Sequence, residues 1–346
     1  MMLLDFQKYG LGEIIENIQN KDVEVEGLIG DVLSFLEEWN SEANRFSIMS
    51  SGTTGEVKEM SFSKEALTTS ANITLASFKL KKGDLVLQAL PLSFVAGKMM
   101  LVRAIIGRLR LKLVIPTANP IKDLNDNYTF TAFTPHQLKT ILIESPEKIN
   151  LFSTIIIGGS KVDKNLEKRL ASFSAIFYET FGMSETLTHV AIRQMNGKKK
   201  SSYFKILEGF KWEVTTKGCL QISAEHIKGS PIITQDLIER IDEDHFLWLG
   251  REDNVINTGG VKVYPEIIEK KLMDSITQPF VISKSKDGRL GEKVVIYFEL
   301  EHKDYISSNP LEYRGLSVFE KPKEIKFIAK FPRNKNGKVI RTLLND

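Results

Sequence analysis

The sequence contains one cysteine, Cys219, and five histidines among 346 residues. A single thiol excludes an internal disulfide and any paired-cysteine metal or redox site. We therefore expect Cys219 to be a small core residue. The histidines show no metal-ligand spacing, so a histidine-based metal centre is not expected either.

Long apolar runs and an excess of positive charge are also missing. No uncharged apolar run approaches the ~18 residues of a membrane span, and the N-terminus has no signal-peptide core. Lys and Arg total 47 against 44 for Asp and Glu, a net charge of +3. That excess is too small for the strongly basic surface of a nucleic-acid-binding domain. We expect a cytoplasmic protein that has no nucleic-acid partner and no membrane insertion.

The composition is otherwise that of a globular protein, and the length predicts two domains at ~150 residues each. Short β-branched or aromatic runs, bounded by Gly, Pro or Asn, predict strands. They cover residues 85–90, 111–115, 128–133, 154–157 and 175–178. Helical patterns between them cover 63–78, 98–106, 135–144 and 164–173. This alternation predicts an α/β domain with a mostly parallel sheet covered by helices.

The pattern changes near residue 205. Turn-separated strands predict a small antiparallel cap at 212–214, 220–223 and 246–249. Beyond it, a helix at 266–273 and strands at 280–283, 293–300 and 324–328 predict a small α+β unit. We therefore predict a large N-terminal domain over 1–250 and a small mobile C-terminal domain over 251–346.

The segment Ser47–Met60, SIMSSGTTGEVKEM, has the composition of a phosphate-binding loop. Glycines permit tight turns and expose backbone N–H groups, hydroxyls add donors, and the lysine supplies positive charge. It is not a Walker loop, because GxxxxGK[ST] occurs nowhere in the sequence. On composition alone, a flexible Ser/Gly linker is an equal alternative.

Three further segments follow in order: YETFGMSET at Tyr178–Thr186, GREDNVINTGGVKVYP at Gly250–Pro265 and PRNKNGKVIR at Pro332–Arg341. Taken alone, the first is better explained as a strand end with a solvated glutamate and the third as a basic tail, and the second could be only a connection. Together and in this order, they resemble the adenylate-forming superfamily of acyl-CoA synthetases, nonribosomal adenylation domains and luciferases. The resemblance covers the chain from about residue 45 to 345.

The resemblance implies an ATP site with Mg²⁺. In this family a loop closes over the β- and γ-phosphates, an aromatic ring stacks on adenine, and an acid binds the ribose. The matching residues are Ser51, Thr53, Thr54, Gly55 and Lys58 in the loop, Gly159, Ser160, Phe181, Gly182 and Ser184 around adenine and the α-phosphate, and Asp236 and Arg251 at the ribose. Glu185 matches the acid that helps hold Mg²⁺, a cation that prefers oxygen ligands. Val57 replaces the usual proline, which should alter loop stiffness more than chemistry.

The resemblance also implies a movable catalytic lysine, Lys338. A carboxylate must approach an anionic phosphate, so a cation and Mg²⁺ are needed to offset the repulsion. In the family, the small domain then rotates about a hinge that matches Asp253. This rotation withdraws the lysine and turns the hairpin matching Gly259 and Gly260 towards the acyl-adenylate to admit CoA. Lys338, Glu185 and Lys58 are the predicted catalytic residues.

Residues 91–104, PLSFVAGKMMLVRA, occupy the place of the family's acyl-pocket motif and resemble o-succinylbenzoate–CoA ligases. The predicted pocket residues are Ser93, Gly97, Lys98, Arg103 and Thr188. Lys98 or Arg103 would suit a substrate with a second carboxylate. Alternatively, both are cations on a helix surface. Ser93-Phe94 departs from the usual aromatic–His pair, which puts the pocket contacts in question.

The function implied is an ATP-dependent acid–CoA ligase that acts through an acyl-adenylate, with 2-succinylbenzoate of menaquinone biosynthesis as the acid, and a homo-oligomer is possible. One alternative is a CoA or carrier-protein ligase for another aryl or short-chain acid. A second is a non-catalytic nucleotide-binding module, which the early position of the phosphate loop suggests. The joint retention of Lys58, Glu185, Asp236, Arg251 and Lys338 argues against that module. Among the histidines, only His189 is expected near the site, because it lies close to Glu185 in sequence.

Overall fold

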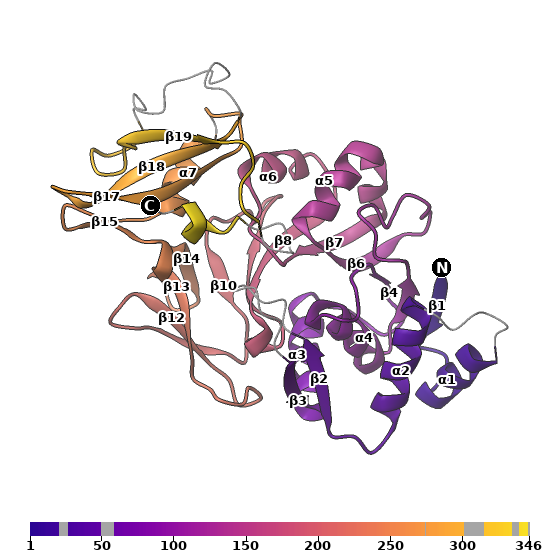
Figure 1. Ribbon diagram of the computed structural model, residues 1–346. Helices are drawn as coiled ribbons and strands as arrows, with labels where there is room; N and C mark the ends of the chain where they lie inside the picture. Colours follow the sequence, from indigo (N-terminus) through magenta and orange to yellow (C-terminus); the bar gives the residue numbers. More distant parts are fainter. Residues whose placement is uncertain (21–26, 50–58, 274, 301–314, 334–338, 345–346) are drawn as a thin grey trace. The chain divides into compact units, whose positions relative to one another are not determined.

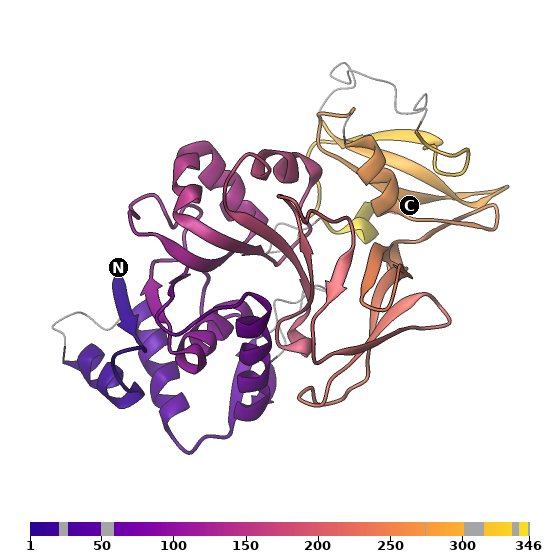
Figure 2. The ribbon, with the colours of Figure 1, turned by 180° about the vertical axis from the view of Figure 1, so that it is seen from behind.

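The computed structural model describes residues 1–20, 27–49, 59–273, 275–300, 315–333 and 339–344 (Figures 1 and 2). The chain divides into two compact units, each treated separately below. Unit 1 comprises Met1–Lys211 and Ser223–Ile232, and unit 2 comprises Trp212–Ile222 and Ile233–Asp346. These bounds describe packing within each unit. The functional boundary after residue 250 and the hinge at Asp253 remain predictions.

Unit 1 is built on a mixed sheet whose strands follow the order β1-β5-β4-β6-β7-β8-β9-β10. The central strands β5, β4, β6, β7 and β8 are parallel, whereas β1, β9 and β10 join antiparallel. The strands are β1 (Met2–Asp5), β4 (Leu85–Gln88), β5 (Arg110–Leu113), β6 (Tyr128–Phe133), β7 (Phe152–Ile157), β8 (Ile176–Gly182), β9 (His189–Gln194) and β10 (Phe204–Ile206). A separate hairpin pairs β2 (Arg45–Met49) with β3 (Glu59–Ser63). The predicted α/β fold with a largely parallel sheet is confirmed.

Helices cover both faces of this sheet (Figure 1). They are α1 (Leu11–Gln19), α2 (Leu28–Asn40), α3 (Lys64–Ser77), α4 (Val95–Gly107), α5 (Pro135–Glu144) and α6 (Lys164–Leu170), with short 3-10 helices η1 (Pro146–Leu151) and η2 (Ser184–Thr186). Successive strand residues point to opposite faces. Val86 accordingly joins the core formed with α3 and α4, and its neighbour Leu87 joins the core formed with α5 and α6.

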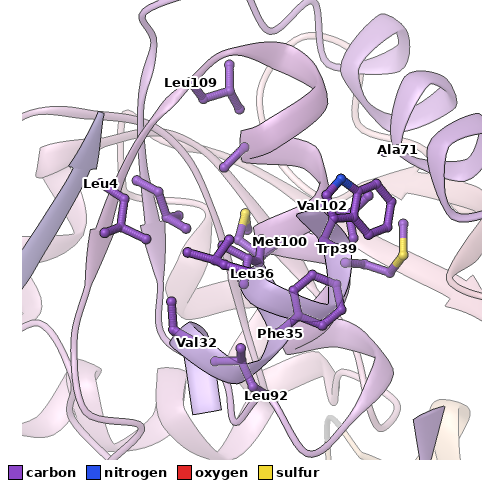
Figure 3. Packing of buried hydrophobic residues seen from close by; sticks show 14 of the residues in the cluster. Leu4, Val32, Phe35, Leu36, Trp39, Ala71, Leu92, Met100, Val102 and Leu109 are labelled. Atoms are coloured by element: carbon purple, nitrogen blue, oxygen red, sulfur yellow. The ribbon is translucent and has the colours of Figure 1, made fainter. Parts of the chain in front are cut away.

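The core beneath α4 is completed by α2, which the sequence analysis did not predict. Its buried residues Val32, Phe35, Leu36 and Trp39 recur at helical spacing. Figure 3 shows Phe35 and Trp39 beside Met100 of α4. The Phe35 and Trp39 rings stack with centroids 5.8 Å apart. This packing ties the N-terminal helices to the sheet.

Local signals explain why the predicted helices form where they do. The Ser63 hydroxyl accepts a hydrogen bond from the Ala66 N–H and caps α3. Thr134 and Gln137 form a capping box at the start of α5, with Pro135 at its first position. The predicted ends were wrong by a few residues elsewhere: β8 continues to Gly182 because it pairs with β9, and α6 ends at Leu170.

Unit 2 contributes the strands β14-β13-β12-β11 and a smaller sheet in the order β16-β15-β18-β17, with β19 added to β18. The elements are β11 (Lys211–Val214), β12 (Cys219–Ser223), β13 (Ile232–Arg240), β14 (His245–Arg251), η3 (Glu252–Asn254), β15 (Ile256–Thr258), β16 (Val261–Val263), α7 (Pro265–Leu272), β17 (Phe280–Asp287), β18 (Gly291–Glu299), β19 (Glu324–Ile328) and η6 (Arg341–Leu344). Ile268 and Leu272 of α7 pack on Ile282 and Phe298 of the smaller sheet. The small α+β unit is therefore confirmed. None of the helices in the described ranges is long and apolar enough to cross a membrane.

Candidate functional site

The predicted nucleotide-binding residues of unit 1 that the structure describes lie at one edge of its sheet. Strands β4, β6, β7 and β8 are parallel, so their carboxyl ends meet at that edge. Ligands of open α/β sheets bind there. Gly159 and Ser160 follow β7, and Phe181 to Glu185 occupy the end of β8 and the turn after it. The structure thus brings these two predicted segments to neighbouring strand ends.

The loop after β7 exposes its backbone at this edge. Gly159 and Ser160 are both exposed, and Gly159 has φ +88°, a conformation that favours glycine. At Gly158, an added Cβ would lie 2.9 Å from the Thr180 hydroxyl oxygen. The far end of the loop is held by the Val162 N–H, which donates to Glu179 at 3.0 Å. A ligand can therefore approach the exposed backbone of Gly159 and Ser160 closely.

A buried ion cluster supports this loop from below. Arg193 donates to Glu179 at 2.8 Å and to Glu167 at 2.9 Å. Burial opposes ionisation of Glu167, but hydrogen bonds from Arg193 and Lys200 outweigh it and hold its pKa below the ordinary value. Burial likewise opposes the charge of Arg193, and the two carboxylates outweigh it and raise its pKa. All three charges are compensated, so the cluster joins α6, β8 and β9.

The turn after β8 is tightly specified. An added Cβ at Gly182 would lie 2.3 Å from the Thr188 carbonyl oxygen, so only glycine fits at this register shift between β8 and β9. Leu187 is buried and has φ +65°, a strained conformation for a non-glycine residue. The Thr186 hydroxyl accepts from the Met183 N–H at 3.1 Å and donates to the Thr188 carbonyl at 2.8 Å. These contacts fix Ser184 and Glu185 on one limb of the turn and Thr188 on the other.

The side chains of the first limb are accessible to a nucleotide. Phe181 and Ser184 are half-buried and Glu185 is exposed. The Phe181 ring meets Phe204 edge-on, with centroids 5.8 Å apart. No group of three or more His, Cys, Asp or Glu side chains within the described ranges is arranged to hold a metal ion. A single exposed carboxylate suits an ion held mainly by phosphate oxygens and water.

Arg103 of α4 is buried, with 1% of its surface exposed. One terminal nitrogen donates to the Thr188 hydroxyl oxygen at 3.0 Å, while the buried Nε has no partner in the described structure. Burial alone lowers the pKa of Arg103 to about 9, and no carboxylate of the described segments offsets it. The alternative of a helix-surface cation is therefore wrong for Arg103.

The other predicted acyl-pocket residues surround the start of α4. An added Cβ at Gly97 would lie 2.1 Å from the Pro91 carbonyl oxygen, so glycine is required where the helix meets the preceding turn. The half-buried Lys98 donates to the Ser47 carbonyl at 2.6 Å. Ser93 is exposed in the turn before the helix. Of the two candidate cations, Arg103 alone is both buried and without a neutralising partner in the described structure.

In unit 2, the predicted ribose residues Asp236 and Arg251 lie opposite each other across β13 and β14. The Trp248 indole N–H donates to Asp236 at 2.9 Å. Arg251 donates to Gln235 and to both carboxylate oxygens of Asp253, at 3.2 and 3.1 Å. The arginine next to the predicted ribose acid thus also contacts the predicted hinge residue.

Gly259 and Gly260 form the turn of the β15–β16 hairpin, with φ +61° and +82°. Positive φ at both central residues is the geometry of a type I′ turn. Both glycines are exposed. Cys219 is buried, which confirms its expected place in the core.

Several predicted residues lie outside the described residues, namely Ser51, Thr53, Thr54, Gly55, Lys58 and Lys338. Their roles remain predictions. One contributor to the site, Thr74 of α3, was not predicted. It lies 3.3 Å from the His189 Nε2, and no motif surrounds it in the sequence.

Comparison with known proteins agrees with this geometry. Residues 12–214 match the model of the AMP-binding enzyme family. A solved acyl-CoA synthetase (AMP-forming)/AMP-acid ligase II-like protein from Dyadobacter fermentans is 30% identical. Its match covers 94% of this chain and 96% of that one, with a TM-score of 0.66.

Two further relatives carry more specific names. A probable 2-succinylbenzoate–CoA ligase of Mycobacterium tuberculosis is 28% identical over 330 residues, which cover 86% of this chain and 82% of that protein. The o-succinylbenzoate CoA synthetase of Bacillus subtilis, solved with the acyl-adenylate intermediate OSB-AMP, is 19% identical and shares the fold, with a TM-score of 0.72. The match covers 87% of this chain and 68% of that one. The family match spans more than half of the chain and includes the strand ends described above. The chain therefore belongs to the AMP-binding enzyme family of adenylate-forming ligases.

Proposed function

We propose that this protein is an ATP- and Mg²⁺-dependent ligase that activates 2-succinylbenzoate as its acyl-adenylate and transfers the acyl group to CoA, in menaquinone biosynthesis in the cytoplasm. The observation that carries the choice of acid is Arg103. Its guanidinium is buried and donates to the Thr188 hydroxyl, without a carboxylate partner among the described residues.

A buried cation of this kind is costly unless an anion pairs with it. The second carboxylate of a dicarboxylic acid would provide that partner, and a guanidinium can bind it through two parallel hydrogen bonds. A monocarboxylic acid has one carboxylate, which reacts with ATP, so none remains to pair with Arg103. Arg103, which has no anionic partner among the described residues, therefore favours a diacid.

The names of the relatives agree with this choice. The Mycobacterium tuberculosis relative is named a probable 2-succinylbenzoate–CoA ligase, and so, without "probable", is one from Geobacillus that is 24% identical over 355 residues. A third relative, from Bacillus anthracis, is a 3,4-dihydroxybenzoate–[aryl-carrier protein] ligase, 23% identical over 325 residues. That relative supports a second candidate, a ligase that loads another aryl acid onto a carrier protein.

For the nucleotide, we assign the strand edge of unit 1. The open backbone at Gly159 and Ser160 fits the flat adenine base, and the accessible Ser184 and Glu185 fit the α-phosphate and Mg²⁺. Bound Mg²⁺ would supply the charge that lets a carboxylate approach the phosphate. Lys338 and Lys58 are proposed to add positive charge at the same stage, with Asp236 and Arg251 at the ribose and Gly259 and Gly260 facing CoA.

The test is an assay with ATP, Mg²⁺, CoA and 2-succinylbenzoate. AMP and pyrophosphate are the expected nucleotide products, and formation of ADP would contradict the mechanism. The matched analogue is 4-oxo-4-phenylbutanoate, which lacks the ring carboxylate and keeps the other one. We expect kcat/KM for this analogue to be about 10²–10³-fold lower, the cost of leaving a buried charge unpaired. A carrier-protein ligase would instead prefer a dihydroxybenzoate and transfer it to the phosphopantetheine arm of a carrier rather than to CoA.

A further inference from the structure

Arg103 is the first member of a buried chain of hydrogen bonds that reaches α3. The Thr188 hydroxyl oxygen lies 3.0 Å from Arg103 and 3.1 Å from Nδ1 of His189. The His189 Nε2 lies 3.3 Å from the Thr74 hydroxyl, which donates to the Ser70 carbonyl at 3.3 Å. His189 and Thr74 are 4% and 0% exposed, whereas Thr188 is half-buried, so bulk water has little access to the end of the chain at α3.

One placement of the protons lets every group in this chain donate or accept in turn. A guanidinium can only donate, so the Thr188 oxygen accepts from Arg103 and its own proton is available for Nδ1 of His189. At the other end, the Ser70 carbonyl can only accept, so Thr74 donates to it and accepts from Nε2. In this placement His189 is neutral and carries its proton on Nε2.

The surroundings of the imidazole agree with a neutral form. Phe78 lies edge-on to the ring, with centroids 5.9 Å apart. The charged group that acts on His189 is Arg103, from α4. Burial and this neighbouring cation hold the pKa of His189 well below its ordinary value.

We propose that His189 is a positioning residue for the acid substrate. By accepting the Thr188 proton, it keeps the hydroxyl oxygen turned towards Arg103, and this holds the guanidinium with its buried Nε free to bind the second carboxylate. The assignment deepens the proposed function and rests on it. It adds a specificity role for a residue that touches neither the reacting carboxylate nor ATP.

The kinetic test compares His189→Leu with His189→Asn. Leucine has no acceptor, whereas the asparagine oxygen can occupy the position of Nδ1. We expect His189→Leu to raise KM for 2-succinylbenzoate about tenfold, the typical worth of one hydrogen bond to a charged network, with kcat and the KM for ATP within about twofold. His189→Asn should stay within about threefold of the wild type. Activity on 4-oxo-4-phenylbutanoate should be the same in all three proteins.

A second pair guards against misfolding of the leucine variant. Thr188→Val removes the hydroxyl and Thr188→Ser keeps it. Thr188→Val should raise KM for the diacid in the same way, whereas Thr188→Ser should keep the KM of the wild type. A merely structural role would lower activity on both acids equally in the Leu and Val variants, and that result would overturn the proposal.

The tautomer provides a readout that does not depend on the substrate. In protein labelled with ¹⁵N-histidine, the signals lost in His189→Asn identify His189. We expect a neutral ring with the proton on Nε2 at pH 7. A proton on Nδ1, or a charged ring, would overturn the proposal. If the wild type prefers the monoacid, the proposed function fails and this inference with it. If the wild type prefers the diacid and His189→Leu retains that preference, the inference alone fails.

Discussion

In unit 1, Arg103 is fully buried and the Arg193 side chain is 11% exposed, but their partners differ completely. Arg193 pairs with Glu167 and Glu179 and also donates to the Ser201 carbonyl at 3.2 Å. Arg103 donates to one hydroxyl, and its Nε has no partner in the part of the chain that the structure describes. Their pKa values shift in opposite directions as a result, up for Arg193 and down for Arg103.

The difference separates a structural ion cluster from a binding group. A buried charge that the protein itself neutralises contributes to how elements are held together, here α6 with β8 and β9. A buried charge without an anionic partner destabilises the protein, because it has lost its hydration. Such a charge is typical of a site where a ligand supplies the anion. Replacing each arginine by methionine, which has a similar length and no charge, should therefore have opposite consequences.

The largest effect is expected for Arg193→Met. It leaves Glu179 without its cation and Glu167 with only the exposed Lys200, so the free energy of unfolding should fall by about 3–5 kcal/mol. Urea denaturation at pH 7 measures this loss. The matched control is Lys200→Met, because Lys200 contacts the same Glu167 at 3.0 Å but is 51% exposed. That exposed pair should contribute about 0–1 kcal/mol. Equal losses in the two variants would remove the distinction.

The next largest effect is expected for Arg103→Met, and it should fall on activity. The free energy of unfolding should stay the same or rise, because the variant removes a buried charge that no described carboxylate neutralises. kcat/KM for 2-succinylbenzoate should fall about 10²–10³-fold, and for 4-oxo-4-phenylbutanoate much less. Lys98→Met, a half-buried cation on the same helix, should cost less than about tenfold on either acid. A large loss of stability in Arg103→Met would instead show that Arg103, like Arg193, has a structural role.

The fold could be predicted where local signals determine it. Helix α5 and strand β6 were predicted with the observed ends, because Thr134 and Pro135 mark the helix start and a β-branched, aromatic run precedes them. Strands β10, β15 and β16, each three residues long, were not predicted as strands. Such short strands are stabilised by pairing with neighbours rather than by their own residues, so their sequences carry little signal.

Only those site residues that lie within recognisable sequence motifs could be predicted. The acyl-pocket segment indicated both Lys98 and Arg103, but which of them is buried depends on how α4 packs on the sheet. The partner of His189 was out of reach in the same way, since Thr74 lies 115 residues away on a helix with no motif. Polar chains of this kind are assembled by tertiary packing, and a sequence pattern does not encode them.

The smallest effect concerns the charge of His189 itself. Because burial and Arg103 lower its pKa in the folded protein, the unfolded chain binds a proton below about pH 6.5 while the folded protein does not. Stability should thus be greatest above pH 6.5 and fall as the pH drops. At pH 5.5 the loss from this one group should be about 1.4 kcal/mol relative to pH 7.5. His189→Asn should lose that much less stability over the same range, whereas the exposed His136→Asn controls for replacing a histidine in general. Urea denaturation at the two pH values measures this difference. An unchanged pH dependence in His189→Asn would mean that the folded protein protonates His189 as readily as the unfolded chain does, which would contradict the lowered pKa.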